Sequence, residues 1–232
     1  SGGNAVSNNH DCRFKPDPVM LLGVPKDGEY VLGIYDGIYR GREDFVYRLT
    51  IGELPYLTRV FPLGGKAGAL PALTMKGWNL DKAGLVPPAK DAGAGIHRVA
   101  ANKAGLYSNP LPFAVDTLPE CLDKEDNNSA AKAQRVQLPI IVNGRIDRQD
   151  DADVFQFSGK AGDMVVAEVM ARRLESPLDS RVQITDAAGK ILAFSDDVED
   201  LGSGVNTHHA DSYSMTKLPA DGAYFVPLAD TG

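Results

Sequence analysis

The stretch LPADGAYFVPLAD, residues 218–230, has a near-copy in VPKDGEYVLGIYD, residues 24–36. The offset between the copies is constant at 194 residues (218 minus 24). A Pro-x-Asp-Gly phrase favours a tight turn, because proline presets φ and glycine supplies a positive φ. The Tyr, Leu or Val, and Ile or Leu that follow stand at every second position, as in a strand with one buried face. The chain is therefore predicted to contain two copies of one β module.

Short strand patterns separated by turn signals recur along the rest of the chain. Phe45, Tyr47, Leu49 and Ile51 alternate over residues 45–51, which is typical of a half-buried strand. Further strands are predicted at 70–80, 96–101, 111–115, 137–146, 154–158, 164–172, 182–185, 191–195, 212–217 and 223–228. A glycine-rich turn is predicted at 61–68. Even spacing without a convincing long helix predicts an all-β protein built of β-sandwich modules.

Charge is distributed unevenly over the 232 residues, whose net charge is −7. Residues 1–119 hold 13 basic and 11 acidic side chains (+2), and residues 120–232 hold 11 and 20 (−9). This excess argues against nucleic acid as a partner and favours cations in the second half. No apolar run approaches the roughly 18 residues of a membrane span. The opening Ser-Gly-Gly-Asn-Ala suggests a cut within a longer sequence, so the lack of a signal peptide does not bear on location.

The two cysteines, Cys12 and Cys121, are too few to define a disulfide framework. They flank the central part of the chain and could close a bridge across it. They are equally compatible with two unpaired thiols.

The middle of the chain resembles the IPT/TIG immunoglobulin-like domains. The resemblance rests on PYLTRVFP at residues 55–62 and on GWNL at residues 77–80. It implies an Ig-like domain over residues 53–118 and carries no binding residues with it.

Residues 120–232 resemble the bacterial pre-peptidase C-terminal (PPC) domain through phrases that occur in the same order. The phrases are EDNN at 125–128, GRI at 144–146, DVFQF at 153–157, AGD at 161–163, SPLD at 176–179, DD at 196–197 and PADGAY at 219–224. Residues 14–52 resemble the closing third of the same domain. The resemblance implies a non-catalytic β-sandwich appended to exported peptidases, whose relatives in bacterial collagenases bind collagen and use calcium at the linker.

Four parts are expected from these resemblances. They are the C-terminal part of a first PPC-like module (1–52), the Ig-like domain (53–118), an acidic linker (119–134) and a second PPC-like sandwich without its last strand (135–232). We hypothesise that residues 45–51, from this or a neighbouring molecule, fill that open sheet edge by strand exchange.

Oxygen-bearing side chains crowd the linker and the turn at residues 150–153, and calcium takes six to eight oxygen ligands. The PPC resemblance assigns the metal ligands Asp123, Glu125, Asn127, Asn128, Asp150 and Asp153. Asn128 departs from the Asp often found at its position, which lowers the charge of the site. The alternative is a solvated acidic turn in which Asn128 or Ser129 caps a short helix. A second acidic set could bind another ion or be plain surface charge: Asp196, Asp197, Glu199, Asp200 and Asp211.

Catalytic signatures are weak. His208, His209 and Asp211 lie near Ser203 and Ser212 in the sequence, but neither a G-x-S-x-G elbow nor an H-E-x-x-H zinc motif is present. A zinc site from His10, Asp11 and Cys12 is weaker still.

The resemblances to PPC and IPT/TIG domains therefore imply a non-catalytic accessory segment of a larger exported bacterial protein, located outside the cytoplasm. It is expected to bind a protein or polysaccharide surface, with calcium ordering the linker. The alternatives are a structural stalk without a ligand and, less favoured, a hydrolase that uses the loop from His208 to Asp211.

Overall fold

The computed structural model describes residues 7–9, 17–37, 40–199, 208–209 and 211–231. The chain divides into two compact units, Ser1–Leu54 and Pro55–Gly232. Among the described residues there is no α-helix, and regular structure consists of strands with two short 3-10 helices, η1 (Ala130–Lys132) and η2 (Arg172–Leu174). The prediction of an all-β protein is confirmed, whereas the four-part domain division stays a prediction. No helix in this part of the chain is long and apolar enough to cross a membrane.

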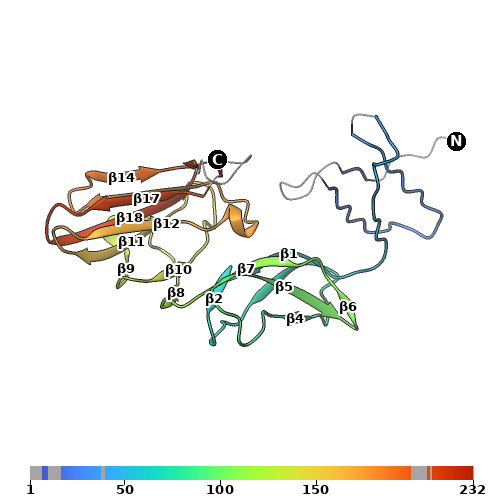
Figure 1. The fold of residues 1–232 in the computed structure, drawn as a ribbon, viewed down its shortest axis with the longest axis horizontal. Coiled ribbons are helices and arrows are strands. Elements are labelled where there is room, and N and C mark those ends of the chain that lie inside the picture. The colour runs from blue at the N-terminus through green and yellow to red at the C-terminus, as the bar shows by residue number, and fades with distance from the viewer. Residues whose placement is uncertain (1–6, 10–16, 38–39, 200–207, 210, 232) are drawn as a thin grey trace. The chain divides into compact units, whose positions relative to one another are not determined.

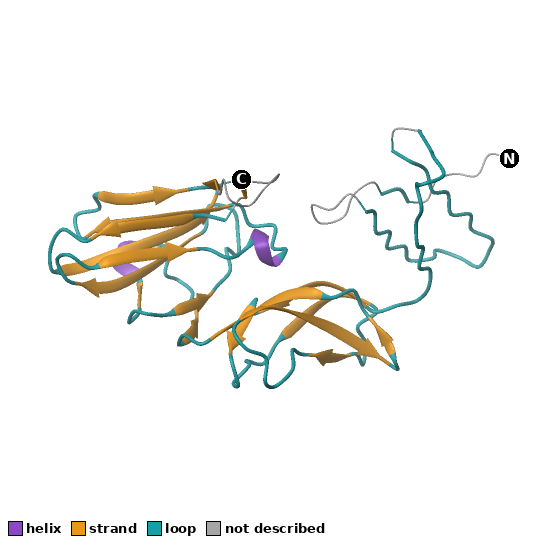
Figure 2. Cartoon of the chain, in the orientation of Figure 1, coloured by secondary structure: helices purple, strands orange, loops and turns teal. Residues whose placement is uncertain are grey.

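The first unit contains no strand among its described residues, which Figure 2 draws as loop. The strands predicted around residues 24–36 and at 45–51 are therefore wrong for this structure. A strand exists only where a neighbouring strand accepts its backbone hydrogen bonds, and here the apolar residues of both segments lie exposed, among them Val31, Val46 and Ile51.

Residues 55–118 form two facing sheets (Figure 1). β1 (Tyr56–Phe61) pairs with β3 (Thr74–Trp78) in one of them. The other has the order β2-β7-β5-β4, with β6 beside β5. Its strands are β2 (Gly64–Lys66), β4 (Gly84–Val86), β5 (Gly95–Lys103), β6 (Leu106–Tyr107) and β7 (Leu111–Asp116).

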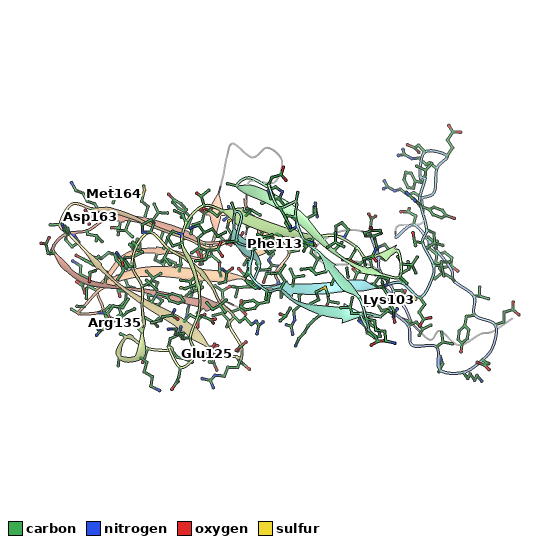
Figure 3. All side chains as sticks on the ribbon, turned by 90° about the horizontal axis from the view of Figure 1, so that it is seen from below. Lys103, Phe113, Glu125, Arg135, Asp163 and Met164 are labelled. Atoms are coloured by element: carbon green, nitrogen blue, oxygen red, sulfur yellow. The ribbon has the colours of Figure 1, made fainter. Side chains whose placement is uncertain are left out.

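Leu57 and Val60 of β1 pack against Val99 of β5 and Phe113 of β7, which is labelled in Figure 3. The glycine-rich segment near residue 64 is a strand rather than the predicted turn, because Gly64–Lys66 runs parallel to β7. A Cβ at residue 64 would lie 2.6 Å from the Ala114 carbonyl oxygen, so only glycine allows this close approach.

The rest of the second unit is built around a five-stranded sheet with the order β14-β13-β18-β11-β9 (Figure 1). The other pairs are β12 with β17, parallel β8 with β10, and β15 with β16. The strands are β8 (Glu120–Leu122), β9 (Gln134–Arg135), β10 (Ile141–Asn143), β11 (Ala152–Gly159), β12 (Met164–Glu168), β13 (Ser180–Asp186), β14 (Ile191–Ser195), β15 (Val198–Glu199), β16 (His208–His209), β17 (Tyr213–Lys217) and β18 (Gly222–Asp230).

The second copy of the repeat lies at the centre of this sheet. β18 pairs with β11 on one side and β13 on the other, both antiparallel. Tyr224 is 3% exposed and stacks on Phe157 with ring centroids 5.7 Å apart. Val165, Ile184 and Leu218 complete the buried cluster around this ring pair.

Candidate metal centre

Two segments distant in sequence bring three carboxylates together. Asp123 follows β8, which is held against β10 by a bond from the Asp123 N–H to the Asn143 carbonyl oxygen (3.1 Å). Asp153 is the second residue of β11, and Glu125, labelled in Figure 3, stands in the loop between β8 and η1. One carboxylate oxygen from each of Asp123, Glu125 and Asp153 lies within 4.8 Å of the others. Like charges at this distance repel unless a proton or a cation intervenes.

Gly144 permits this convergence. A Cβ at residue 144 would stand 3.2 Å from an oxygen of Asp123 and 3.2 Å from an oxygen of Asp153. Both contacts are tighter than a side chain normally accepts, so any larger residue would push the two carboxylates apart.

Asn127 lies beside the cluster and is 1% exposed. Its backbone carbonyl oxygen accepts a bond from the Val154 N–H (3.0 Å), which fixes the loop against β11. Among the described residues, its side-chain amide oxygen has no hydrogen-bond partner, and neither does one oxygen of Asp153. Burying unpaired polar atoms costs about 1–3 kcal/mol each. A hard cation with oxygen ligands would satisfy the amide oxygen and the carboxylates together, so these residues fit calcium.

Electrostatics point the same way. Burial, followed by the charges of Asp123, Glu125 and Asp151, raises the pKa of Asp153 to about 7. Burial is also the main reason that the pKa of Asp123 lies above its ordinary value. Carboxylates whose ionisation is this unfavourable gain most from a bound cation.

Asp150, another predicted ligand, is not among the three grouped carboxylates. The Asn128 amide nitrogen donates to Asp151 (2.6 Å), while its amide oxygen is buried without a partner. Asp150 has φ 61° and an exposed side chain. The alternative interpretation of a capped helix is not supported as stated, because Ser129 precedes η1 without any side-chain cap bond.

Asp151 and Arg145 belong to the site although they were not among the predicted ligands. Asp151 is 4% exposed and accepts from Asn128 and from the Asp147 N–H (2.9 Å). The Arg145 N–H donates to Asp123 (3.2 Å), while its guanidinium lies 3.7 Å from the centre of the Phe61 ring in β1. The acidic run at 150–153 pointed to this region, but only the backbone shows which acids face inward.

In the second acidic set, Asp211 has a structural role. Asp211 is fully buried and accepts bonds from the N–H groups of Ala171, Arg172 and Arg173 and from the Arg173 guanidinium (2.6–3.0 Å). It is thus a structural anchor for η2 and neither surface charge nor an open ion ligand. The Asp196 carboxylate accepts a bond from the Asp197 N–H (3.1 Å), and Asp200 lies outside the described residues.

Several of the remaining candidate residues are not among those that the structure describes. Ser203, His10, Asp11 and Cys12 lie outside the described ranges, and the backbone of His208 and His209 is described only as β16. Ser212 is buried against Ser180, with a distance of 3.0 Å between the hydroxyl oxygens. Cys121 is a free, half-buried thiol that accepts a bond from the Gln134 amide.

No protein-family model matches the chain. The chain is similar to a probable subtilase-type serine protease of Deinococcus radiodurans, with 42% identity over 221 residues. The alignment covers 91% of this chain and 27% of that protein. The chain thus spans about a quarter of the length of that protein.

Proposed function

We propose that this chain is a non-catalytic accessory segment of an exported subtilase-type protease, located outside the cytoplasm. The observation that carries this proposal is the 42% identity to a probable subtilase-type protease over only 27% of that protein, combined with an all-β architecture. The resemblance to PPC and IPT/TIG domains supports the same role. Fold alone does not name a ligand, so the ligands are argued from the surface and the metal centre.

Calcium is the cation proposed for the cluster. Asp123, Glu125 and Asp153 would hold it through carboxylate oxygens, and Asn127 through its unpaired amide oxygen. When bound, the ion supplies positive charge that offsets the repulsion among the acids and orders the loop after β8. Because Asp123 is bonded to Arg145, whose side chain stacks on Phe61, ordering the loop would also steady the contact with the Ig-like sandwich.

The outer face of the β12–β17 pair is proposed as the surface that contacts protein or polysaccharide. Val166 lies directly opposite Met215, and both are about half exposed. Met164 (labelled in Figure 3) and Tyr213 extend this apolar face along the two strands. Exposed apolar and aromatic side chains grouped on one sheet face are typical of interaction sites, which favours a binding role over a stalk.

Thermal unfolding in EDTA and in millimolar calcium tests the metal site. A ligand present at 100 times its dissociation constant stabilises the native state by about 2.7 kcal/mol. We expect calcium to raise the Tm of the parent and not that of Glu125→Gln. Asp126→Asn is the matched control, because Asp126 is exposed and pairs with Lys132 outside the cluster. Equal calcium-induced Tm shifts in all three proteins, or no shift in the parent, would show that calcium does not bind at this cluster.

Sedimentation with gelatin beads and with insoluble cellulose tests the surface. We expect the parent to bind one of the two and Val166→Asp with Met215→Asp to lose that binding. Ile191→Asp, an equally exposed apolar position on β14, is the control and should bind like the parent. If the parent binds neither material, the stalk alternative takes the place of the binding role.

A further inference from the structure

We propose that residues 28–36 are a latent central strand. In this proposal they form a docking surface for the open sheet of another β-sandwich module, one that offers strands of the β11 and β13 type with a vacant position between them. The inference rests on the internal repeat and on what the structure does with each copy, independently of the metal site.

The second copy shows what such a strand needs. β18 pairs with all eight residues of β11, from Ala152 opposite Ala229 to Gly159 opposite Gly222. On its other edge it pairs with β13, with Val182 opposite Leu228. Asp221, in the turn before β18, accepts a bond from the Ala161 N–H (2.7 Å) in the turn after β11. The second copy is thus held by β11, by β13 and by the turn after β11.

The first copy keeps the local structure of the second. The Tyr30 hydroxyl donates to the Lys26 carbonyl oxygen (2.8 Å), and the Tyr224 hydroxyl donates to the Ala220 carbonyl oxygen (2.6 Å). Both bonds join a tyrosine to the residue four before it, at the repeat offset. The same local tyrosine bond is therefore formed in both copies, whether or not the sheet is present, although neither Gly28 nor Gly222 takes the predicted positive φ.

What the first copy lacks is its partners. Tyr30 is 39% exposed, against 3% for Tyr224, and Val31 is 91% exposed. Leu32 and Ile34, which correspond to Val226 and Leu228, are also exposed. The Asp36 carboxylate accepts a bond from the nearby Arg40 N–H (2.8 Å), whereas its counterpart Asp230 accepts from the Asp179 N–H at the start of β13.

The register of the second copy defines the partner. Since Phe157 lies opposite Tyr224, an aromatic ring is expected opposite Tyr30, and a β-branched residue like Val182 opposite Ile34. β11 and β13 of a second copy of this chain do not qualify, because each already holds its own β18. The partner is therefore a module of this sequence type that lacks its own counterpart of β18.

A graft within the full chain is the first test. Residues 218–228 are replaced by the sequence of residues 24–34, with Ala229 and Asp230 kept because Ala229 is buried in the sheet. We expect the grafted chain to unfold cooperatively and to keep amide protection in β11 and β13. A control graft with the same residues in scrambled order should lose both. If the unscrambled graft behaves like the scrambled one, the two copies are not equivalent and the proposal is overturned.

Binding in trans is the second test, with the full chain that carries the scrambled sequence at residues 218–228 as the probe for a module in which β18 cannot form. We expect the parent chain to form a 1:1 complex with this probe in which the amides of residues 28–36 of the parent become protected. Tyr30→Asp with Leu32→Asp should weaken the complex at least tenfold, and Met20→Asp, an exposed apolar position of the same unit, should not. No complex, a complex indifferent to the double variant, or protection lost in β18 instead would each contradict the proposal.

Discussion

The two copies of the repeat share a local tyrosine hydrogen bond and a sequence pattern, but only one of them is a strand. β18 is hydrogen-bonded on both edges, whereas residues 28–36 have no strand neighbour in the part of the chain that the structure describes, although their tyrosine makes the same local bond. The contrast separates what sequence decides locally from what a sheet adds. The hydrogen bond of the tyrosine hydroxyl is made within five residues, while strand structure depends on partner strands far away in the chain.

Amide hydrogen exchange should show the largest difference between the copies. The amides of β18 that bond to β11 or β13 open only when the sheet opens, whereas those of residues 28–36 are free to exchange from the native state. We expect rates that differ by about a thousandfold or more, since global stabilities of about 5 kcal/mol or above are usual. Comparable rates in the two copies, measured by NMR or mass spectrometry, would mean that the first copy is also part of a stable sheet.

Truncating the repeated tyrosine should sharpen the comparison. Tyr224→Ala removes a fully packed ring and its stacking on Phe157, and we expect a loss of about 3–5 kcal/mol in the free energy of unfolding. Tyr30→Ala removes only an exposed ring and one surface hydrogen bond, so its loss should be under about 1 kcal/mol. Denaturant unfolding, followed by a probe in the second unit, gives both values. Equal losses would contradict the assignment of the core to the second copy alone.

The acidic cluster should give the second unit a dependence on pH that calcium removes. The folded pKa of Asp153 is about 7, above the ordinary value of about 3.9 expected for the unfolded chain. Between these two pKa values the folded state binds more protons than the unfolded state. In EDTA, the contribution of Asp153 to stability is therefore fully present below about pH 4 and is lost as the pH rises to about 7.

Tm measured in EDTA between pH 4 and pH 8 tests this sign. Asp153→Asn should flatten the fall, and millimolar calcium should counteract it near pH 7 by binding the ionised carboxylates. A parent that gains stability over this range without calcium would show that the carboxyl is not protonated in the folded state.

The final aspartate of the repeat should give the smallest difference. Asp230 bonds the Asp179 N–H across the sheet (3.0 Å), and Asp36 bonds the nearby Arg40 N–H. Both side chains are solvent-accessible, so Asp230→Ala should cost about 1 kcal/mol and Asp36→Ala less than about 0.5 kcal/mol. Denaturant midpoints resolve this gap, and an equal or reversed order would show that the bond to Asp179 adds nothing.

Strand positions in the second unit could be predicted well because period-2 alternation and turn residues act there together. Residues 191–195 are β14 with the predicted bounds, and 154–158 lie within β11. The predicted strands were too long at 137–146 and 164–172, where the structure has only Ile141–Asn143 and Met164–Glu168. Around residues 24–36 and at 45–51 the same pattern failed, since alternation shows which face could be buried and not whether anything covers it.

The candidate site could be located from sequence only as a region. The density of acids near residues 123–128 and 150–153 marked two segments that do meet. Which acids converge depends on the parallel pairing of β8 with β10 and on the room at Gly144, neither of which composition reveals. Asp211 shows the same limit, because an acid in a loop-like stretch is in fact a buried anchor for three backbone N–H groups.

The central place of β18 has a consequence for synthesis. β11 begins at Ala152 and β18 at Gly222. About 70 residues are therefore synthesised between the start of β11 and the start of β18, which joins β11 to β13. At 5–20 residues per second, the nascent chain waits roughly 4–14 s with a gap in the middle of its sheet. During this interval, the first copy of the same phrase has already left the ribosome. If residues 28–36 can fill such a gap, as proposed above, the early copy competes with β18 for it, and the order of emergence helps to decide which strand fills the sheet.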